Sequence, residues 1–313
     1  MKLLDLAFGA LMAATVAAAP AIGPAAASDR ISIGTGGTGG LFYVIGAGMA
    51  DQLNKHLDNA FARAEVTGAS IENIRRVAAG QMTFGFSSSS TLYEAKHGEG
   101  AFKQPQPVAA MAYLYPAVLQ IVTIEGTGIK SFADLRGKRV NLGPPGSNSA
   151  VLAQRLLEAY GVFDPSKVQF LSYTEGTAAL LNDNIDATAV LAGAPTSALI
   201  DLAAHRPMLV LTVDESKIGD LLKKYPFYQL YTIAPNTYSG QTQAVTVIND
   251  PATIFTKEDA DPKLIHAITK TIFDHLDELK QVHPQAKAIA ASTATKTPIP
   301  LHPGAKQYFD EAK

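Results

Sequence analysis

The sequence predicts an α/β protein with parallel sheets, divided into two domains of about 100–150 residues each. Two observations indicate this fold class. Short β-rich runs, each closed by a glycine or serine turn, alternate with stretches of helical periodicity along the chain. The chain also has 313 residues, of which 47% are hydrophobic and only 17% are charged, so each domain can bury a sizeable core.

Strand-like runs and helical stretches follow one another in order. The runs that end in turn residues are residues 31–34, 62–67, 83–86, 140–143, 168–172 and 187–191. Between them, apolar residues at helical spacing predict helices over 41–57 and 151–160, packed on the sheets. The same spacing predicts one long amphipathic helix over 262–280, which packs back on the first domain.

Two segments are expected to carry the chain between the domains. Strand-like runs on either side of Pro116, within 108–124, indicate the first crossing. Residues 231–248, which contain three turn-forming residues before another strand-like run, indicate the return. The predicted first lobe is therefore 28–118 with 240–313, and the predicted second lobe is 119–239.

The N-terminus has the layout of a cleavable secretory signal. Lys2 precedes an apolar stretch that ends in the small residues Ala25, Ala26 and Ala27, so we expect residues 1–27 to be removed and the protein to be periplasmic. A membrane anchor is the alternative, but prolines and glycines interrupt the apolar run.

Composition argues against several classes of protein. The absence of cysteine excludes disulfides, thiolate metal sites and cysteine nucleophiles, and a net charge of −2 argues against a nucleic-acid partner. The seven histidines are scattered, and no H-E-x-x-H, G-x-S-x-G or P-loop lysine is present. We therefore expect no catalytic site, no metal site and no cofactor.

A glycine-rich segment, residues 34–40, follows a predicted strand and opens a predicted helix. Its backbone N–H groups and the helix dipole can face an anion. It also satisfies G-x-G-x-x-G through Gly34, Gly36 and Gly39, with Glu65 as the candidate ribose-binding acid. A periplasmic dinucleotide enzyme is thus one alternative and a tight structural turn another. The export signal, the place of Glu65 inside its predicted strand and the lack of an acid–base partner argue against the enzyme.

Small polar residues mark the starts of several predicted helices. They are Ser70, Ser88 within the run 87–90, Ser147 with Asn148, and the loop from Gly193 to Pro195, with Pro195 expected in the first helical turn. A single serine is more typical of an N-cap than of a ligand contact. Together, beyond the carboxyl ends of strands, they predict a pocket that holds a carboxylate with N–H and hydroxyl donors.

Two arginines lie on the helix that follows Ser70. Arg75 and Arg76 either reach an anion in this pocket or lie on the polar surface of the helix.

Three motifs in this order resemble a known family. They are the glycine segment 34–40 with Tyr43, the sequence TGASIEN at 67–73 and the sequence GPPGS at 143–147. Together they resemble the TAXI class of solute receptors for TRAP transporters, and the similarity continues to residues 299–305. The resemblance implies a type II-like periplasmic-binding-protein fold, in which two α/β lobes joined by strand crossings close on a ligand between them.

The resemblance also implies a ligand and a partner. The ligand is a small anionic metabolite, commonly a C5 dicarboxylate such as 2-oxoglutarate or glutamate, delivered to a membrane permease that an ion gradient drives. The positions that match the ligand-facing ones are Thr35, Thr38, Tyr43, Ser70, Asn73, Ser147 and Asn148, with the loop from Gly193 to Pro195. We expect a monomer that closes by a hinge motion. A ligand-sensing partner of a membrane kinase remains an alternative.

One departure from the family pattern affects specificity. The family often places glutamine and aspartate after the third strand, where this chain has Ser88 and Ser90. Because serine cannot supply a charge for a substrate ammonium, we expect dicarboxylates or keto acids to be preferred over amino acids.

Overall fold

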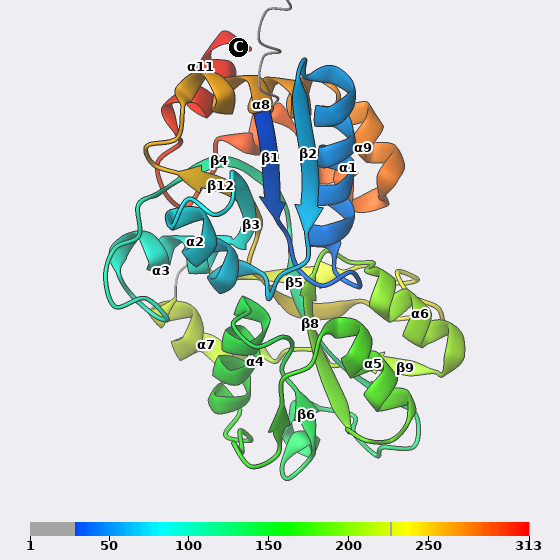
Figure 1. The fold of residues 1–313 in the computed structure, drawn as a ribbon. Helices are drawn as coiled ribbons and strands as arrows, with labels where there is room; N and C mark the ends of the chain where they lie inside the picture. Colours follow the sequence, from blue (N-terminus) through cyan, green and yellow to red (C-terminus); the bar gives the residue numbers. More distant parts are fainter. Residues whose placement is uncertain (1–28, 226, 313) are drawn as a thin grey trace, which may run out of the picture.

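The structure, a computed structural model, describes residues 29–225 and 227–312 and contains two sheets, each flanked by helices (Figure 1). The predicted signal segment 1–27 lies outside the described residues. The first sheet has the order β2-β1-β3-β12-β4, in which β1 pairs in parallel with β2 and β3. Its strands are β1 (Asp29–Gly34), β2 (Ala60–Glu65), β3 (Phe84–Ser88), β4 (Val108–Tyr115) and β12 (Ala252–Lys257). The predicted α/β class is confirmed, but the sheets are mixed and not parallel as predicted, because β12 pairs antiparallel with β3 and β4, and in the second sheet β5 (Val118–Ile124) pairs antiparallel with its neighbours.

Helices of the first lobe come from both ends of the chain. They are α1 (Leu41–His56), α2 (Ser70–Ala78), α3 (Ser89–His97), α8 (Pro262–Asp274), α9 (Leu276–Val282), η2 (Pro284–Ala288), α10 (Ala291–Ala294) and α11 (Pro303–Glu311). The prediction of a single helix over 262–280 is wrong, because the helix is interrupted at His275, between α8 and α9. The Gln52 side chain of α1 donates to the His275 carbonyl oxygen at 2.6 Å, so this oxygen serves the packing of the helices.

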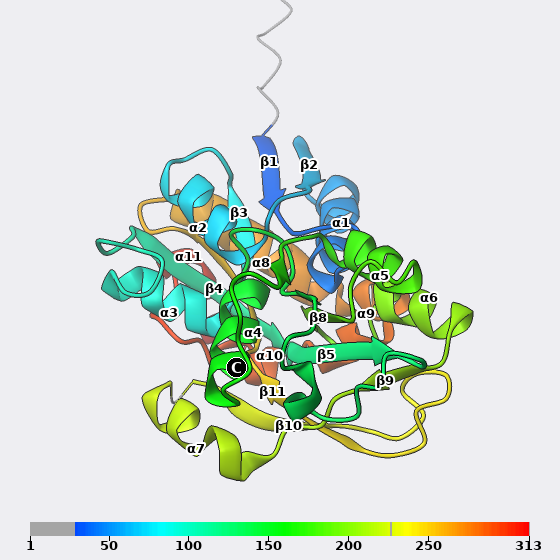
Figure 2. The same cartoon turned by 90° about the horizontal axis from the view of Figure 1, so that it is seen from below.

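The second sheet has the order β10-β11-β5-β8-β6-β7, with β9 paired to β5. Figure 2 shows β5, β8, β9, β10 and β11 of this sheet. Its strands are β5 (Val118–Ile124), β6 (Val140–Asn141), β7 (Val168–Gln169), β8 (Ala187–Ala192), β9 (Met208–Val210), β10 (Gln229–Ile233) and β11 (Val245–Asn249). Its helices are η1 (Phe132–Leu135), α4 (Asn148–Ala159), α5 (Tyr173–Leu181), α6 (Ser197–His205) and α7 (Glu215–Lys224). Within the described residues, no helix is both long and apolar enough to cross a bilayer.

The chain passes between the sheets twice. The first crossing, between β4 and β5, lies at Pro116 as the sequence predicts. The second lies at Asp250 and Pro251, between β11 and β12, so the predicted return within 231–248 is wrong. Strand β11 pairs antiparallel with β10 and with β5, which places residues 245–249 in the second sheet although 240–313 was assigned to the first lobe. A strand pattern alone does not reveal which sheet the strand joins.

Asp250 joins the two crossings. Its backbone N–H donates to the Ala117 carbonyl oxygen at 2.8 Å, and its carboxylate accepts from the Ser90 backbone N–H at 2.9 Å. The side chain is fully buried, and this burial raises the pKa of the Asp250 carboxyl to about 6; hydrogen bonds from Ser90 and Asn148 oppose the rise, while nearby Glu94 adds to it. An ionised carboxylate at this position therefore costs stability at neutral pH.

This pKa predicts a pH dependence that Asp250→Asn removes. Between pH 6 and pH 4 the folded state binds a proton at Asp250 that the unfolded state, with its ordinary pKa near 3.8, does not. Lowering the pH through this range should stabilise the wild type relative to Asp250→Asn by up to about 1.4 kcal/mol per pH unit. Urea unfolding of both proteins at pH 7.5, 6 and 4.5 measures the difference, and parallel pH profiles would contradict the assignment.

Close packing of α11 on α8 predicts contrasting effects of two Gly→Ala changes. A Cβ at Gly304 would overlap the Pro262 carbonyl oxygen and come within 2.8 Å of the His266 nitrogen. Gly304→Ala should therefore destabilise the protein by about 1–3 kcal/mol or more. Gly219, inside α7, has open space around its would-be Cβ, so Gly219→Ala should stabilise by about 0.5–1 kcal/mol. Thermal unfolding compares them, and a melting temperature for Gly304→Ala at or above that of the wild type would refute the packing argument.

Candidate functional site

A cavity lies between the two lobes, at the ends of strands β1, β3 and β8. Its empty space totals about 390 Å³, but only about 20 Å³ of this is open to the centre of a water-sized sphere, so the closed lobes leave room for about one water molecule. The lining residues are Gly36, Gly37, Gly40, Leu41, Phe42, Ala69, Ser70 and Ser88 from the first lobe, and Pro144, Ser147, Asn148, Ser149, Tyr173 and Leu191 from the second. None of these described lining residues carries a charge, so any charged ligand must be held by dipoles and hydrogen bonds.

Five helices begin at this cavity. They are α1, α2 and α3 from the first lobe and α4 and α5 from the second. The N-cap residues of the first three, Gly40, Ala69 and Ser88, provide no side-chain cap, whereas Ser147 and Ser172 cap α4 and α5. The start of α3 is nevertheless paired, because the backbone N–H groups of Ser89 and Ser90 donate to the Pro251 carbonyl oxygen at 2.8 Å and to the Asp250 carboxylate at 2.9 Å. Helix starts such as those of α1 and α2 present N–H groups and a partial positive charge, which suits an anion.

Backbone strain marks one of these helix starts. Ala69 has a φ of 71° and a ψ of −142°, a conformation that favours glycine and costs of the order of 1–3 kcal/mol for a residue with a Cβ. Since Ala69 lines the cavity, the strain lies where a ligand would be held.

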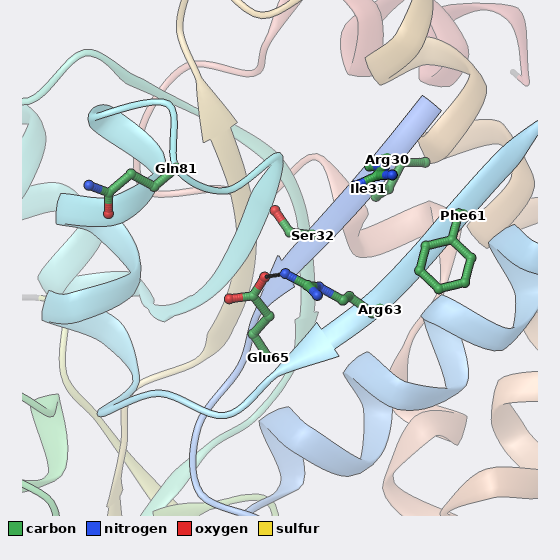
Figure 3. Close-up of a pocket in the computed structure, with 7 residues that line it drawn as sticks. All are labelled: Arg30, Ile31, Ser32, Phe61, Arg63, Glu65 and Gln81. Carbon is green, nitrogen blue, oxygen red and sulfur yellow. Dashed lines mark hydrogen bonds and ion pairs between the residues drawn. The ribbon is translucent and has the colours of Figure 1, made fainter. Parts of the chain in front are cut away.

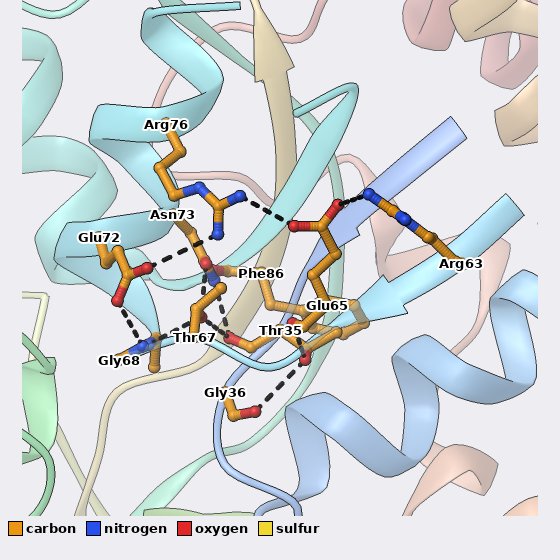
Figure 4. A network of polar contacts seen from close by, with 11 residues as sticks. Thr35, Gly36, Arg63, Glu65, Thr67, Gly68, Glu72, Asn73, Arg76 and Phe86 are labelled. Carbon is orange, nitrogen blue, oxygen red and sulfur yellow. Dashed lines mark hydrogen bonds and ion pairs between the residues drawn. The ribbon is translucent and has the colours of Figure 1, made fainter. Parts of the chain in front are cut away.

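A buried polar network fixes the glycine loop from behind (Figure 4). The Thr35 hydroxyl donates to the Glu65 carbonyl oxygen at 2.6 Å, and the Asn73 amide donates to the carbonyl oxygens of Thr35 and Phe86 at 2.7 and 2.8 Å. The Thr67 hydroxyl donates to Asn73 Oδ1 at 2.7 Å. Thr35 and Asn73 were expected to face the ligand, but these bonds take up their polar groups and place them outside the cavity.

Two serines do present polar groups to the cavity. The Ser88 backbone N–H donates to Ser70 Oγ at 3.0 Å, which leaves the Ser70 hydroxyl proton free to donate. Ser88 Oγ is buried, and within the described part of the chain it has no hydrogen-bond partner. A buried hydroxyl without a partner is costly unless a ligand or water satisfies it.

The remaining predicted ligand-binding residues also fall into two groups, those that line the cavity and those that do not. Ser147 and Asn148 line the cavity together with Ser70 and Ser88. Thr38 is exposed and Tyr43 is half-buried outside the lining. Gly193 packs on the first lobe instead, where a Cβ would lie 2.5 Å from Leu41 Cδ2. Pro195 does not begin a helix, because α6 starts at Ser197.

Sequence reasoning missed Tyr173, which begins α5. Its hydroxyl donates to the Leu191 carbonyl oxygen at 2.9 Å, and burial raises the pKa of the phenol to about 12. The capping pair Ser172 and Glu175 just before and within α5 is the sequence signal that could have located this helix start. From the glycine segment, the backbone of Gly36, Gly37 and Gly40 lines the cavity rather than the threonines between them.

The acid of the dinucleotide motif is engaged elsewhere. Glu65 is the last residue of β2, not inside the strand as predicted, but its carboxylate accepts from Arg63 at 3.1 Å and from Arg76 at 2.8 Å (Figure 4). It lines a separate surface hollow with about 970 Å³ of empty space along β1 and β2 (Figure 3). Arg75 donates to the Ala101 carbonyl oxygen, so neither candidate arginine reaches the cavity.

The lobes also touch beside the cavity. The Gly39 carbonyl oxygen accepts from Thr196 Oγ1 at 3.3 Å and from the Ala198 backbone N–H at 3.4 Å. These contacts join the glycine loop to the start of α6, so the lobes lie in a closed arrangement.

Two solved structures of low sequence identity share this fold. MatC from Rhodopseudomonas palustris with bound malate has a TM-score of 0.56 and 14% identity, over 90% of this chain and 97% of that chain. The binding protein component of an ABC phosphonate transporter from Pseudomonas aeruginosa has a TM-score of 0.54 and 11% identity, over 84% of this chain and 80% of that one. The predicted periplasmic-binding-protein fold is therefore confirmed.

A family model also matches the sequence. The model of the NMT1-like family matches residues 33–312, nearly all of the chain that the structure describes. The chain belongs to the NMT1-like family.

Proposed function

We propose that this protein is the periplasmic solute receptor of an uptake transporter, and that it binds a small carboxylate between its lobes. One observation carries the proposal: five helix starts meet at one cavity, and those of α1 and α2 have no side-chain cap. Such a cavity can hold an anion through backbone N–H groups and hydroxyls. It contains no described nucleophile with an adjacent base, as a hydrolase would need.

The ligand that we favour is a C5 dicarboxylate such as 2-oxoglutarate, for which the cavity must widen, since the lobes as they stand leave room for about one water molecule. The cavity has N–H donors from both lobes, so each end of a dicarboxylate can be held by a different lobe. The unpartnered Ser88 hydroxyl and the Ser70 hydroxyl are additional donors. MatC, which shares the fold, is described with bound malate, and by analogy we infer a carboxylate ligand for this chain.

Glutamate is expected to bind less well than the keto acid. An α-ammonium group needs a carboxylate or several acceptors in contact, and the described lining contains no carboxylate. Asp250 is close, but its oxygens accept from Ser90 and Asn148.

The transporter is expected to be of the TRAP type. The order of the three sequence motifs supports this through its resemblance to TAXI receptors. The signal-like N-terminus supports delivery of the ligand outside the cytoplasm.

The ligand class can be tested by thermal unfolding. Protein that has been unfolded and refolded to strip bound metabolite should melt at a higher temperature with C4 to C6 dicarboxylates or keto acids, because binding to the native state alone stabilises it. Amino acids and nucleotides serve as controls in the same panel. A rise only with a dinucleotide would favour an enzyme, and no rise at all would count against the receptor.

Calorimetry tests the preference within that class. We expect 2-oxoglutarate to bind at least about tenfold more tightly than glutamate, because the ammonium of glutamate would be buried without a counter-charge. Tighter binding of glutamate would show that the cavity supplies a negative partner and would contradict the assignment.

Closure can be tested at the glycine loop. A Cβ at Gly39 would lie 2.5 Å from Thr174 Oγ1 and 3.3 Å from Ala198 Cβ, both in the second lobe. Gly39→Ala should therefore hold the lobes apart and weaken binding about tenfold or more. Gly219→Ala, which adds a Cβ in open space on α7 outside the cavity lining, is the control. Equal affinities for the two variants would argue against closure around the ligand.

A further inference from the structure

Helices α3 of the first lobe and α4 of the second face each other beside the ligand cavity. Ser90 and Glu94 lie one turn apart on α3, and Asn148 and Arg155 lie two turns apart on α4. The pairs Ser90 with Asn148 and Glu94 with Arg155 therefore form two polar contacts across the interface of the lobes.

The first contact is built on the chain crossing. Asn148 Nδ2 donates to Ser90 Oγ at 3.1 Å and to the Asp250 carboxylate. Asp250 also accepts from the Ser90 backbone N–H at 2.9 Å. Because the Asp250 backbone N–H donates to the Ala117 carbonyl oxygen in the other crossing, one buried residue joins both crossings, α3 and α4.

The second contact is a buried ion pair. Arg155 Nη2 donates to Glu94 Oε1 at 2.8 Å, with only 14% and 7% of the two side chains exposed. Arg155 Nη1 donates to the Tyr228 hydroxyl at 2.8 Å, and the guanidinium lies 4.0 Å from the centre of the Tyr225 ring. All of its partners except Glu94 belong to the second lobe, so only Glu94 is lost when the lobes part.

We propose that these contacts, Ser90–Asp250–Asn148 and Glu94–Arg155, form a latch that holds the lobes closed without a ligand. This rests on the hinge closure proposed above and not on the identity of the ligand. A buried carboxylate and a buried guanidinium satisfy each other only in the closed geometry, because opening removes the partner of each. The latch therefore fixes the closed arrangement and raises the fraction of receptor that is ready to bind.

The absence of cysteine makes a direct test practical. Asp51→Cys on α1 and Ala133→Cys in the second lobe, both at exposed positions, provide two unique sites for fluorophores. Energy transfer in single molecules then measures the ratio of closed to open protein without ligand. We expect a populated closed state in the parent, and a ratio lowered about tenfold or more by Glu94→Gln or by Arg155→Met, each of which leaves a buried charge unpaired.

Three further variants make the result specific to the latch. Glu94→Gln combined with Arg155→Met should lower the ratio of closed to open protein by less than the two single changes taken together, because neither charge is left unpaired. Tyr228→Phe, which removes a single hydroxyl, should shift the ratio in the same direction by a smaller factor. Arg139→Gln breaks an ion pair of similar length, 2.7 Å to Asp186, within the second lobe and should leave the ratio unchanged.

The outcomes are distinguishable from those of the ligand tests. A parent protein that is entirely open without ligand would overturn the latch, and so would single variants whose ratio equals that of the parent or of Arg139→Gln. Circular dichroism and melting curves confirm that each variant is folded, and Tyr228→Phe keeps the test decisive if a charge variant does not fold. If no carboxylate binds but the ratio still falls in the charge variants, the latch stands and the proposed ligand does not.

Discussion

The N–H groups in the first turn of a helix need acceptors, and this requirement shapes the cavity. Helices α1 and α2 follow Gly40 and Ala69, neither of which supplies a side-chain acceptor, whereas the first N–H groups of α3 donate to Pro251 and Asp250. The strained backbone of Ala69 and the unpartnered Ser88 hydroxyl lie at the same place. A helix start that is enclosed and left uncapped is stable only when something else accepts its hydrogen bonds. The groups that the protein leaves unsatisfied are thus the groups that a carboxylate would satisfy.

Rigid support behind the cavity is as important as the donors themselves. The Asn73 side-chain amide connects three segments. It accepts from Thr67, just before α2, and donates to Thr35 in the glycine loop and to Phe86 in β3. Gly34 must be glycine, since a Cβ there would come within 2.7 Å of Asn73 Oδ1. The glycine segment therefore has two uses: its first residue allows close packing against Asn73, and its later residues expose backbone to the cavity.

Local sequence patterns predicted the elements well and the long-range pairings poorly. Most strands, the crossing at Pro116 and the helix starts at Ser70 and Ser147 follow from periodicity and from turn residues within a few positions, whereas β9 and β12 were not predicted. The latch does not, because Asp250 and Asn148 are 102 residues apart and Arg155 and Glu94 are 61 apart. The second crossing was misplaced for the same reason.

Thr35 and Asn73 show the limit of assigning function by residue type. Both are polar residues next to a glycine loop, as ligand contacts often are, but the fold uses their hydrogen bonds to hold the loop. Only the position of the side chain relative to the cavity separates the two roles, and a sequence pattern does not contain that information.

The charged side chains at the interface of the lobes lie outside the ligand cavity, and this affects the release of the ligand. A guanidinium in contact with a carboxylate would form a strong bidentate pair and slow dissociation, which is unfavourable for a receptor that must deliver its ligand. Here the buried Arg155 and Glu94 face each other outside the described cavity lining, and the ligand would contact only neutral donors. The apparent affinity of such a receptor equals its intrinsic affinity multiplied by the closed fraction. A latch that raises this fraction tenfold improves the apparent affinity tenfold with no added ligand contact, and a partner that pulls α3 and α4 apart would withdraw that gain at once.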